Sequence, residues 1–204
     1  MIGVGIIGAG GISQSHANGY LQLPDQVEII AVADLDYERA KLAADRWGAK
    51  HAFSDYQQML QLDEIDAVSV CTFTKAHCQP SIDALKAGKH VLVEKPMAAT
   101  AEEGVQMVKA SRQNHRILMV GMKWRFMPEV LAAKAFIEDH KLGEIYYTEA
   151  IGWQHRGIPG RTFIQKETAG GGAFMDMGAH AVHLMRTFLG PVESVCATIG
   201  NAAG

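Results

Sequence analysis

Short apolar runs alternate with helical stretches through the first part of the chain, and this alternation restricts the folds that it can adopt. The runs are nearly unbroken and rich in valine and isoleucine, like strands that are buried on both faces of a parallel sheet. They span Ile2–Ile7, Val27–Ala33, Ala67–Cys71, His90–Val93 and Ile117–Val120. Strands that alternate with helices predict a doubly wound α/β domain, in which right-handed crossovers join parallel strands.

The helical stretches have recognisable ends. Tyr37–Trp47 carries small or apolar residues at helical spacing and stops at Gly48, a typical helix terminator. Thr100 and Glu103 form a capping-box pattern, which predicts a helix that begins there and ends at about Asn114. These helices fit the crossovers of a doubly wound fold, because each follows one apolar run and precedes another.

The pattern changes near residue 121, and we divide the chain into a first domain over residues 1–122 and a second over 123–204. In chain order, the second domain is expected to hold a helix over Pro128–His140, a strand over Glu144–Gly152, a helix over Ala173–Leu189 and a strand over Val192–Ile199. Two strands and two helices make a thin domain. We therefore expect the second domain to be incomplete in this sequence.

A glycine-rich turn follows the first apolar run and reads Gly8-Ala9-Gly10-Gly11-Ile12-Ser13. Glycines let the chain turn tightly and let its N–H groups approach a pyrophosphate, to which the next helix offers its positive N-terminus. Asp34 stands directly after the second apolar run, where an acid accepts hydrogen bonds from the adenine ribose. This context predicts a dinucleotide-binding Rossmann domain, with cofactor-binding residues Gly8, Gly10, Gly11, Ile12 and Asp34. The alternative is a plain glycine turn with a helix-capping aspartate.

The acidic side chain of Asp34 also bears on the choice of cofactor. A carboxylate at this position would repel the 2′-phosphate of NADP, which favours NAD. Leu35 and Asp36 supply no cation directly after it, although Arg39 lies one helical turn further along. We therefore expect NAD as the cofactor, with NADP as the open alternative.

Composition excludes several classes of function. The chain has 204 residues and a net charge of −3, from 19 basic and 22 acidic side chains, so a nucleic-acid partner is not expected. The 3 cysteines include no Cys-x-x-Cys pair, which argues against a disulfide framework or a zinc ribbon and fits a reducing cytoplasm. The apolar runs are all too short for a membrane span.

Further motifs follow one another along nearly the whole chain. They are Val68–Thr72, His77, Ala84–Val93, Glu94-Lys95-Pro96, Gly121–Phe126, Leu142–Ile145, Gly170–Gly172, and Asp176 with Gly178 and His180. In this order they resemble the glucose–fructose oxidoreductase and inositol dehydrogenase family (Gfo/Idh/MocA). The resemblance implies an N-terminal Rossmann domain and a C-terminal α/β domain with an open, mostly antiparallel sheet. Many members associate through that sheet, so a homo-oligomer is expected.

The resemblance also implies an activity. Family members mostly transfer a hydride between NAD(P) and a secondary alcohol or ketone of a sugar, a cyclitol or a derivative. By resemblance, Lys95 hydrogen-bonds the substrate hydroxyl, His180 is the general base, and Asp176 binds substrate and orients the site. The cofactor-binding residues implied in addition to the glycine turn are Thr72, His77, Glu94 and Lys95. Judged by its position alone, Lys95 would be a solvated surface residue that follows a strand.

The spacing of Asp176 and His180 supports these roles, because residues four apart on a helix share a face. A nearby carboxylate raises the pKa of a histidine and orients its ring, which suits a general base. An exposed ion pair is the alternative. His183 adds a second histidine to this face, but the three side chains match no fixed metal-binding spacing, so no metal is expected.

Three residues of the second domain are further candidates for contact with a substrate. Arg125 stands at its start and is a candidate for lining the cleft, with packing between the domains as the alternative. Trp153 and Arg161 come from the strand and loop that follow, where aromatic faces and cations suit a polyhydroxylated or acidic sugar, although such loop residues are more often solvated. Two other functions stay open. One is a nicotinamide-dinucleotide sensor or regulatory module without turnover, and the other is an inactive fragment of the enzyme.

Overall fold

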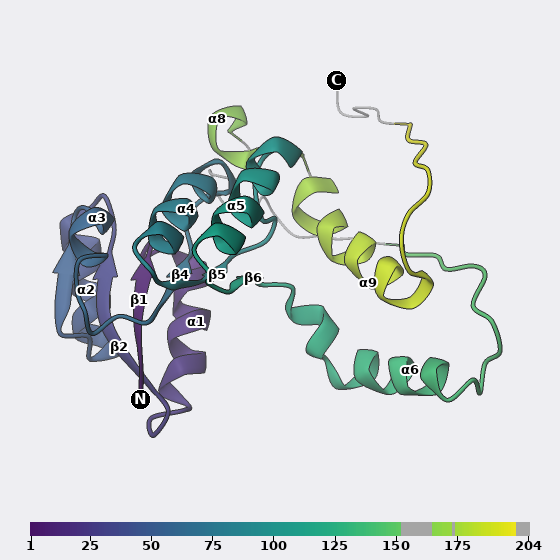
Figure 1. Cartoon of the computed structure of the whole chain (residues 1–204), viewed down its shortest axis with the longest axis horizontal. Helices are drawn as coiled ribbons and strands as arrows, with labels where there is room; N and C mark the ends of the chain where they lie inside the picture. The colour runs from purple at the N-terminus through teal and green to yellow at the C-terminus, as the bar shows by residue number, and fades with distance from the viewer. Residues whose placement is uncertain (152–164, 173, 199–204) are drawn as a thin grey trace. The chain divides into compact units, whose positions relative to one another are not determined.

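The computed structural model describes residues 1–151, 165–172 and 174–198, and Figure 1 labels most of its helices and strands. Contacts divide the chain into two compact units. Unit 1 comprises Met1–Gly121 and His155–Asp176, and unit 2 comprises Met122–Gln154 and Met177–Gly204. Unit 1 is therefore assembled from two separate stretches of the sequence.

Unit 1 contains a six-stranded sheet in which all neighbouring strands are parallel. Its strands are β1 (Ile2–Ile7), β2 (Val27–Ala33), β3 (His51–Phe53), β4 (Ala67–Val70), β5 (His90–Val93) and β6 (Leu118–Val120). They lie in the order β3-β2-β1-β4-β5-β6, so the strand order reverses between β1 and β4 (Figure 1). This is the doubly wound Rossmann arrangement that the sequence predicts.

The bounds of the strands agree closely with the apolar runs. Strands β1, β2 and β5 match them, while β4 ends one residue earlier, at Val70, and β6 begins one residue later, at Leu118. Strand β3 was not predicted. It has only three residues and lies at the edge of the sheet. An edge strand is not buried like a central one, so its sequence need not be a long apolar run.

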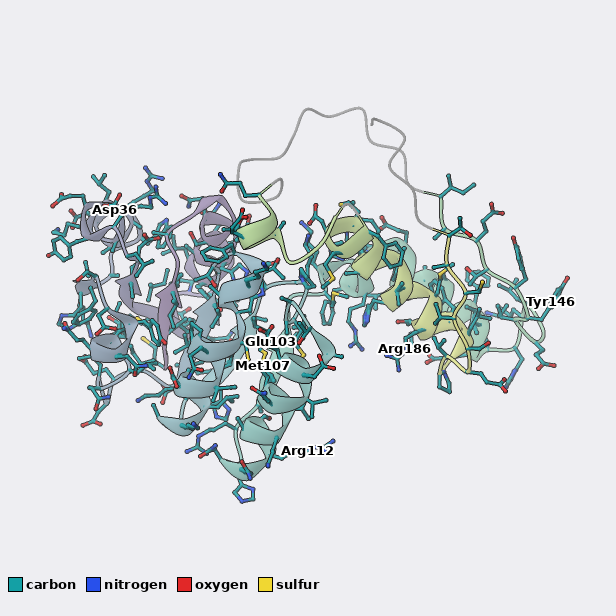
Figure 2. The ribbon with its side chains drawn as sticks, turned by 90° about the horizontal axis from the view of Figure 1, so that it is seen from above. Asp36, Glu103, Met107, Arg112, Tyr146 and Arg186 are labelled. Atoms are coloured by element: carbon teal, nitrogen blue, oxygen red, sulfur yellow. The ribbon has the colours of Figure 1, made fainter. Side chains whose placement is uncertain are left out.

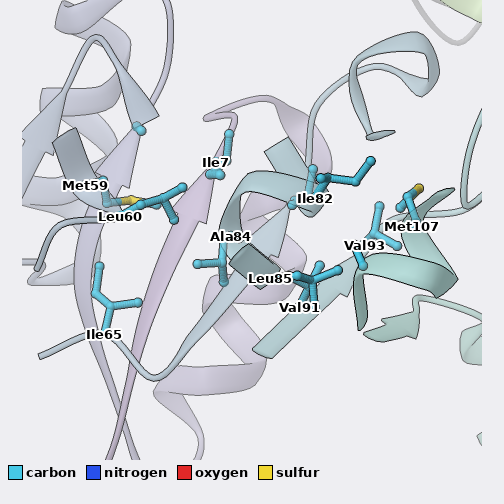
Figure 3. Close-up of a cluster of buried hydrophobic side chains, with 14 of the residues drawn as sticks. Ile7, Met59, Leu60, Ile65, Ile82, Ala84, Leu85, Val91, Val93 and Met107 are labelled. Atoms are coloured by element: carbon cyan, nitrogen blue, oxygen red, sulfur yellow. The ribbon is translucent and has the colours of Figure 1, made fainter. Parts of the chain in front are cut away.

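Helices cover both faces of the sheet. In unit 1 they are α1 (Gly11–Leu21), α2 (Tyr37–Trp47), α3 (Tyr56–Met59), α4 (Cys78–Lys86), α5 (Ala101–Gln113) and α8 (Lys166–Ala169), with the short turn η1 (Thr74–Ala76). Ile6 packs in a core with α1 and α2, whereas its neighbour Ile7 packs in a core with α4 and α5. Successive strand residues point to opposite faces, so the two cores lie on the two sides of the sheet. Figure 3 shows the second core, which includes Leu85 and Met107.

The end of α2 at Gly48 and the start of α5 at Thr100 confirm the capping signals of the sequence, and Asp36 adds a cap that was not predicted. The Asp36 side chain accepts a hydrogen bond from the N–H of Arg39, and α2 ends at Gly48. The Thr100 hydroxyl accepts from the N–H of Glu103, whose own carboxylate accepts from the N–H of Ala99. Figure 2 shows Asp36 and Glu103 at these two helix starts. Each such cap stabilises a helix by about 1 kcal/mol.

Unit 2 contains the turn η2 (Lys123–Phe126) and the helices α6 (Pro128–Glu138) and α9 (Ala179–Leu189). The predicted start of α6 at Pro128 is confirmed. The strands expected over Glu144–Gly152 and Val192–Ile199 are not formed in residues 144–151 and 192–198. An extended segment becomes a strand only when its N–H and C=O groups pair with a neighbour, and the described residues of unit 2 offer none. The antiparallel sheet of the second domain stays a prediction.

The helix expected from residue 173 differs at its start. Residues Phe174–Gly178 form a π-helical turn, η3, and the α-helix α9 begins only at Ala179. The carbonyl oxygen of Asp176, in this turn, accepts a hydrogen bond from Lys95 Nζ. In a regular α-helix the Asp176 carbonyl would accept from the N–H four residues further on. The π-helical turn is consistent with a carbonyl that instead accepts from Lys95. Among the described residues, no helix is both long enough and apolar enough to cross a bilayer.

Candidate functional site

A cleft of about 790 Å³ lies in unit 1, next to the residues that follow the carboxyl ends of the strands. Ligands of doubly wound folds bind at this edge of the sheet, near the point where the strand order reverses. The cleft is lined by all the residues that the sequence suggested for a cofactor: Gly8, Gly10, Gly11, Ile12, Asp34, Thr72, His77, Glu94 and Lys95. The fold brings these residues together from the ends of β1, β2, β4 and β5.

The glycines of the turn serve different purposes. Gly8 has a φ of +93°, and a Cβ there would lie 2.8 Å from the carbonyl oxygen of Cys71, so the fold itself requires glycine. At Gly10 and Gly11 a Cβ would meet no atom within 4 Å. Glycine at these two positions leaves open space in front of α1, where a phosphate can approach the first N–H groups of the helix.

Ser13 occupies the position where such turns usually carry glycine or alanine. Its side chain is fully buried, and its hydroxyl donates a hydrogen bond to the carbonyl oxygen of Gly10 at 2.5 Å. A serine is therefore small enough for α1 to pack on the sheet, and its polar atom is satisfied within the turn.

Asp34 holds the glycine turn against the end of β2. One oxygen of its carboxylate accepts from the N–H of Ala9 at 2.8 Å, and the other accepts from the N–H of Asp36 at 3.0 Å. A carboxylate has about four acceptor sites in total, so the side chain can also receive the ribose hydroxyls of a dinucleotide. Arg39 lines the same cleft. The open glycine positions, this carboxylate and the size of the cleft fit an NAD molecule.

Lys95 forms an ion pair with Asp176. Its ammonium contacts Asp176 Oδ1 and also donates to the main-chain oxygen of Asp176 at 3.1 Å. The two side chains are mostly buried, with 17% and 24% of their surface exposed. Asp176 thus belongs to unit 1 although it is 81 residues from Lys95 in the sequence, and its carboxylate binds a lysine that lines the cleft.

His77 was expected beside the cofactor, but its ring is occupied by the main chain. It is almost fully buried, with Nδ1 at 2.8 Å from the oxygen of Pro96 and Nε2 at 3.0 Å from the oxygen of Thr72. Burial lowers the pKa of His77, although the two carbonyl oxygens act in the opposite direction. A neutral imidazole has one N–H and can donate to only one carbonyl at a time. His77 thus ties the segment after Lys95 to the end of β4.

His180 lies in unit 2, at the start of α9. Its side chain is buried, and its ring stacks on Trp124 of η2 with the ring centres 4.4 Å apart and the planes 14° from parallel. Nε2 of His183 has no hydrogen-bond partner among the described residues. Burial lowers the pKa of His183, and Arg125 and Arg186 act in the same direction.

Of the substrate-binding candidates in the second domain, the structure describes Arg125 but not Trp153 or Arg161. The Arg125 guanidinium lies 5.3 Å from the centre of the Phe126 ring, a cation–π distance. Within the described residues, no group of three or more histidine, cysteine, aspartate or glutamate side chains is arranged to hold a metal ion.

Sequence reasoning missed a buried polar row beneath the cleft. His16 of α1 lies between Ser69 of β4 and Glu94, with Nδ1 at 3.1 Å from Ser69 Oγ and Nε2 at 3.0 Å from Glu94 Oε1. Tyr20 Oη lies 2.6 Å from the same Ser69 oxygen. The one available signal was Ser69 itself, a polar residue at an otherwise apolar stretch of a buried strand.

The carboxylate of Glu94 is held in its charged form by this surrounding. Burial alone would raise the pKa of Glu94, but the hydrogen bond from His16 and the bond from the N–H of Lys95 outweigh it and lower the pKa below its usual value. The N–H of Lys95 lies 3.0 Å from Glu94 Oε2. The lysine is therefore fixed at its main chain by one carboxylate and at its ammonium by another.

The strand order, the glycine turn and the lysine at the cleft define a Rossmann protein of the dinucleotide-dependent oxidoreductase class. Residues 2–122 match the family model of the oxidoreductase family with an NAD-binding Rossmann fold, and residues 130–204 match the GFO/IDH/MocA C-terminal domain. The chain belongs to the Gfo/Idh/MocA oxidoreductase family.

Named dehydrogenases are among its relatives. D-glucoside 3-dehydrogenase of Escherichia coli K12 is 33% identical over 188 residues, covering 92% of this chain and 54% of that protein. Levoglucosan dehydrogenase of Pseudarthrobacter phenanthrenivorans is 30% identical over 211 residues, covering 98% and 54%. Myo-inositol 2-dehydrogenase of Thermotoga maritima is 28% identical over 195 residues, covering 95% and 57%. The chain spans about half the length of the curated relatives it matches.

Solved structures agree with this assignment. A levoglucosan dehydrogenase in complex with NADH and levoglucosan aligns with a TM-score of 0.83 at 29% identity, covering 93% of this chain and 54% of that one. The same dehydrogenase solved with NADH alone also gives a TM-score of 0.83, at 30% identity. The likeness covers the part of the fold that carries the cleft.

Proposed function

We propose that this chain acts in an NAD-dependent oxidoreductase that transfers a hydride between nicotinamide and a secondary alcohol or ketone of a sugar, a cyclitol or a derivative. The observation that carries the proposal is the ion pair of Lys95 with Asp176, formed in the unit that holds the dinucleotide cleft. The names of the relatives, which include a glucoside, a levoglucosan and an inositol dehydrogenase, support the class of substrate.

In this proposal NAD, when bound, accepts the hydride from the alcohol carbon. The residues of the chain hold the alcohol and move its proton. The Lys95 ammonium donates a hydrogen bond to the hydroxyl oxygen and stabilises the negative charge that grows there as the O–H proton leaves. Asp176 holds that ammonium in place through the ion pair and through its main-chain oxygen. His180, as general base, takes the hydroxyl proton, which leaves a ketone, NADH and a protonated imidazole.

The cofactor form follows from the same cleft. The Asp34 carboxylate supports NAD over NADP, because a 2′-phosphate at the ribose would meet a negative charge. Arg39 lies in the same lining, and its positive charge would favour the phosphate. NADP is therefore included in the test.

The test is a screen of NAD and NADP with sugars, sugar acids and inositols, followed through the ultraviolet absorbance of NADH. Replacing the proposed groups by Lys95→Ala or His180→Gln should lower kcat by roughly two orders of magnitude or more. Affinity for NADH, measured by fluorescence titration, should change little. Lys109→Ala, at an exposed position of α5, is the matched lysine control and should leave both values unchanged.

Two outcomes would contradict the proposal. Saturable NADH binding without turnover on any substrate would favour a sensor or regulatory module. Turnover that survives both substitutions would remove Lys95 and His180 from the reaction and assign the chemistry to other residues.

We also propose that the chain associates with copies of itself through the sheet expected in its second domain, and that it works in the cytoplasm. The family resemblance supports association, and sedimentation of the purified protein tests it, since a monomer at micromolar concentration would contradict it.

The proposed compartment is supported by the thiols of Cys71, Cys78 and Cys196, which are all free. Cell fractionation tests it.

A further inference from the structure

A row of buried polar side chains runs beneath the cleft from α1 to the loop that carries Lys95. His16 is the centre of this row, with its side chain 9% exposed and that of Glu94 13% exposed. Ser69 is fully buried in the middle of the sheet. Polar groups in such a place cost free energy unless each finds a partner, so their hydrogen bonds limit how the row can be arranged.

The donor and the acceptor of each hydrogen bond in this row can be assigned from the charge of Glu94. The charged carboxylate of Glu94 can only accept, so the hydrogen of the bond to His16 belongs to Nε2. In a neutral ring Nδ1 then accepts from the Ser69 hydroxyl, whose oxygen accepts in turn from Tyr20 Oη. The row continues without a break to the other oxygen of Glu94, which accepts from the N–H of Lys95.

The carboxylate of Glu94 has little room to turn. Its Oε1, the oxygen that contacts His16, also faces Gly121, where an added Cβ would lie 3.2 Å from this oxygen. Gly121 is itself fixed by a hydrogen bond from its N–H to the oxygen of Val93, at 2.8 Å. His16 therefore supplies the polar contact that decides which way the carboxylate points within a narrow space.

We propose that His16 is a positioning residue for the reaction proposed above, because it holds Glu94 and through Glu94 the main chain of Lys95. The inference rests on that proposed function. Without the His16 contact, the buried Glu94 carboxylate lacks one of its partners, and the charge of Lys95 still attracts it. Glu94 would then compete with Asp176 for the Lys95 ammonium.

The position of His16 adds a second consequence. It lies on α1, the helix whose N-terminus faces the open side of the glycine turn. The helix proposed to receive the pyrophosphate thus also holds the segment of the lysine proposed to act on the substrate. The two proposed halves of the reaction are thus joined through the side chains of His16 and Glu94.

Two conservative substitutions separate positioning from packing. The side-chain amide of His16→Gln can reach Glu94 in place of Nε2, whereas the shorter amide of His16→Asn reaches only the Ser69 side in place of Nδ1. If the histidine acts through Glu94, His16→Gln keeps kcat near the wild-type value, while His16→Asn and His16→Ala lower it by roughly tenfold to a hundredfold. The Kd for NADH should stay close to wild type in all three. A histidine that only packs α1 on the sheet would give equal effects for glutamine and asparagine.

A readout independent of turnover accompanies these variants. The rate at which an amine-reactive reagent modifies Lys95, read by mass spectrometry of its peptide, reports how firmly the ammonium is held. Because Glu94 would then hold the ammonium together with Asp176, we expect several-fold slower modification in His16→Asn and His16→Ala than in wild type and His16→Gln. Asn18→Ala, at an exposed position of the same helix, is the control for disturbance of α1 and should match wild type.

The outcomes separate the two proposals. Equal modification rates in all His16 variants would overturn the positioning role, whatever the activity. A wild-type chain that turns over no substrate, with Lys95 modification that follows the glutamine and asparagine pattern, would contradict the proposed function and leave the holding of Lys95 by His16 supported.

Discussion

Two glycines of the same turn should respond to alanine in opposite ways. Gly8 has a φ of +93°, and its added Cβ would lie 2.8 Å from the oxygen of Cys71 and 3.1 Å from the nitrogen of Thr72. These are main-chain atoms at the end of β4, which cannot swing aside. Gly10 has a φ of −80° and a ψ of −173°, and its added Cβ would meet nothing within 4 Å.

The magnitudes follow from these geometries. A left-handed backbone costs an L-residue about 1–2 kcal/mol. Overlap with neighbours that cannot yield adds about 1–3 kcal/mol. Gly8→Ala should therefore lower the free energy of unfolding by about 2–5 kcal/mol, a large share of the roughly 5–15 kcal/mol of a typical domain. Gly10→Ala adopts an ordinary extended backbone and should be neutral or stabilise by about 0.4–1 kcal/mol through the unfolded state.

The assay pairs stability with binding. Urea unfolding, followed by circular dichroism and by fluorescence of the buried Trp47, gives the free energy of unfolding for each variant. Fluorescence titration gives the Kd for NADH. Gly10→Ala should weaken NADH by at least about tenfold, or 1.4 kcal/mol, because its methyl group stands where a phosphate approaches. Gly19→Ala, in the middle of α1 with open space around it, is the control and should leave NADH binding unchanged.

Either half of this reasoning can be refuted separately. A Gly10→Ala protein that binds NADH as tightly as wild type would show that the phosphates do not approach this part of the turn. A Gly8→Ala protein with the urea midpoint of wild type would show that the end of β4 gives way to the methyl group, against the packing described for it.

Two further predictions concern charge. Asp34→Ser should shift the ratio of NADPH to NADH affinity toward NADPH, because the repulsion of the 2′-phosphate is removed, and competitive titration of both cofactors measures it. An unchanged ratio would assign cofactor choice to other residues. Burial lowers the folded-state pKa of His77, so the unfolded chain binds more protons, and stability falls as pH drops below the ordinary histidine value of about 6.5. His77→Leu should flatten this slope in urea unfolding between neutral and mildly acidic pH, and a slope identical to wild type would contradict the shift.

The parts of the fold that are determined locally could be predicted from the sequence. Strands β1, β2 and β5 were found as apolar runs, because a strand buried on both faces has to be apolar at nearly every position. The residues around the cleft were found for a related reason. They follow directly after such strands, and all parallel strands end at one edge of the sheet.

Features that depend on distant partners could not be predicted in this way. His16 and Glu94 are 78 residues apart, and nothing in the sequence near either residue indicates the other. The pairing exists because the strand order places β4 beside β1 and β5 beside β4. The strands expected in unit 2 are not formed in the described residues for the complementary reason, since a suitable residue pattern becomes a strand only beside a neighbour.

The discontinuity of unit 1 matters for recombination between relatives. Lys95 comes from its first stretch and Asp176 from its second, with part of unit 2 encoded between them. A chimera joined at residue 122 would combine the lysine of one parent with the carboxylate of the other. A transplanted segment of residues 1–122 therefore keeps the Lys95–Asp176 ion pair of its own parent only if the stretch that carries Asp176 is transplanted with it.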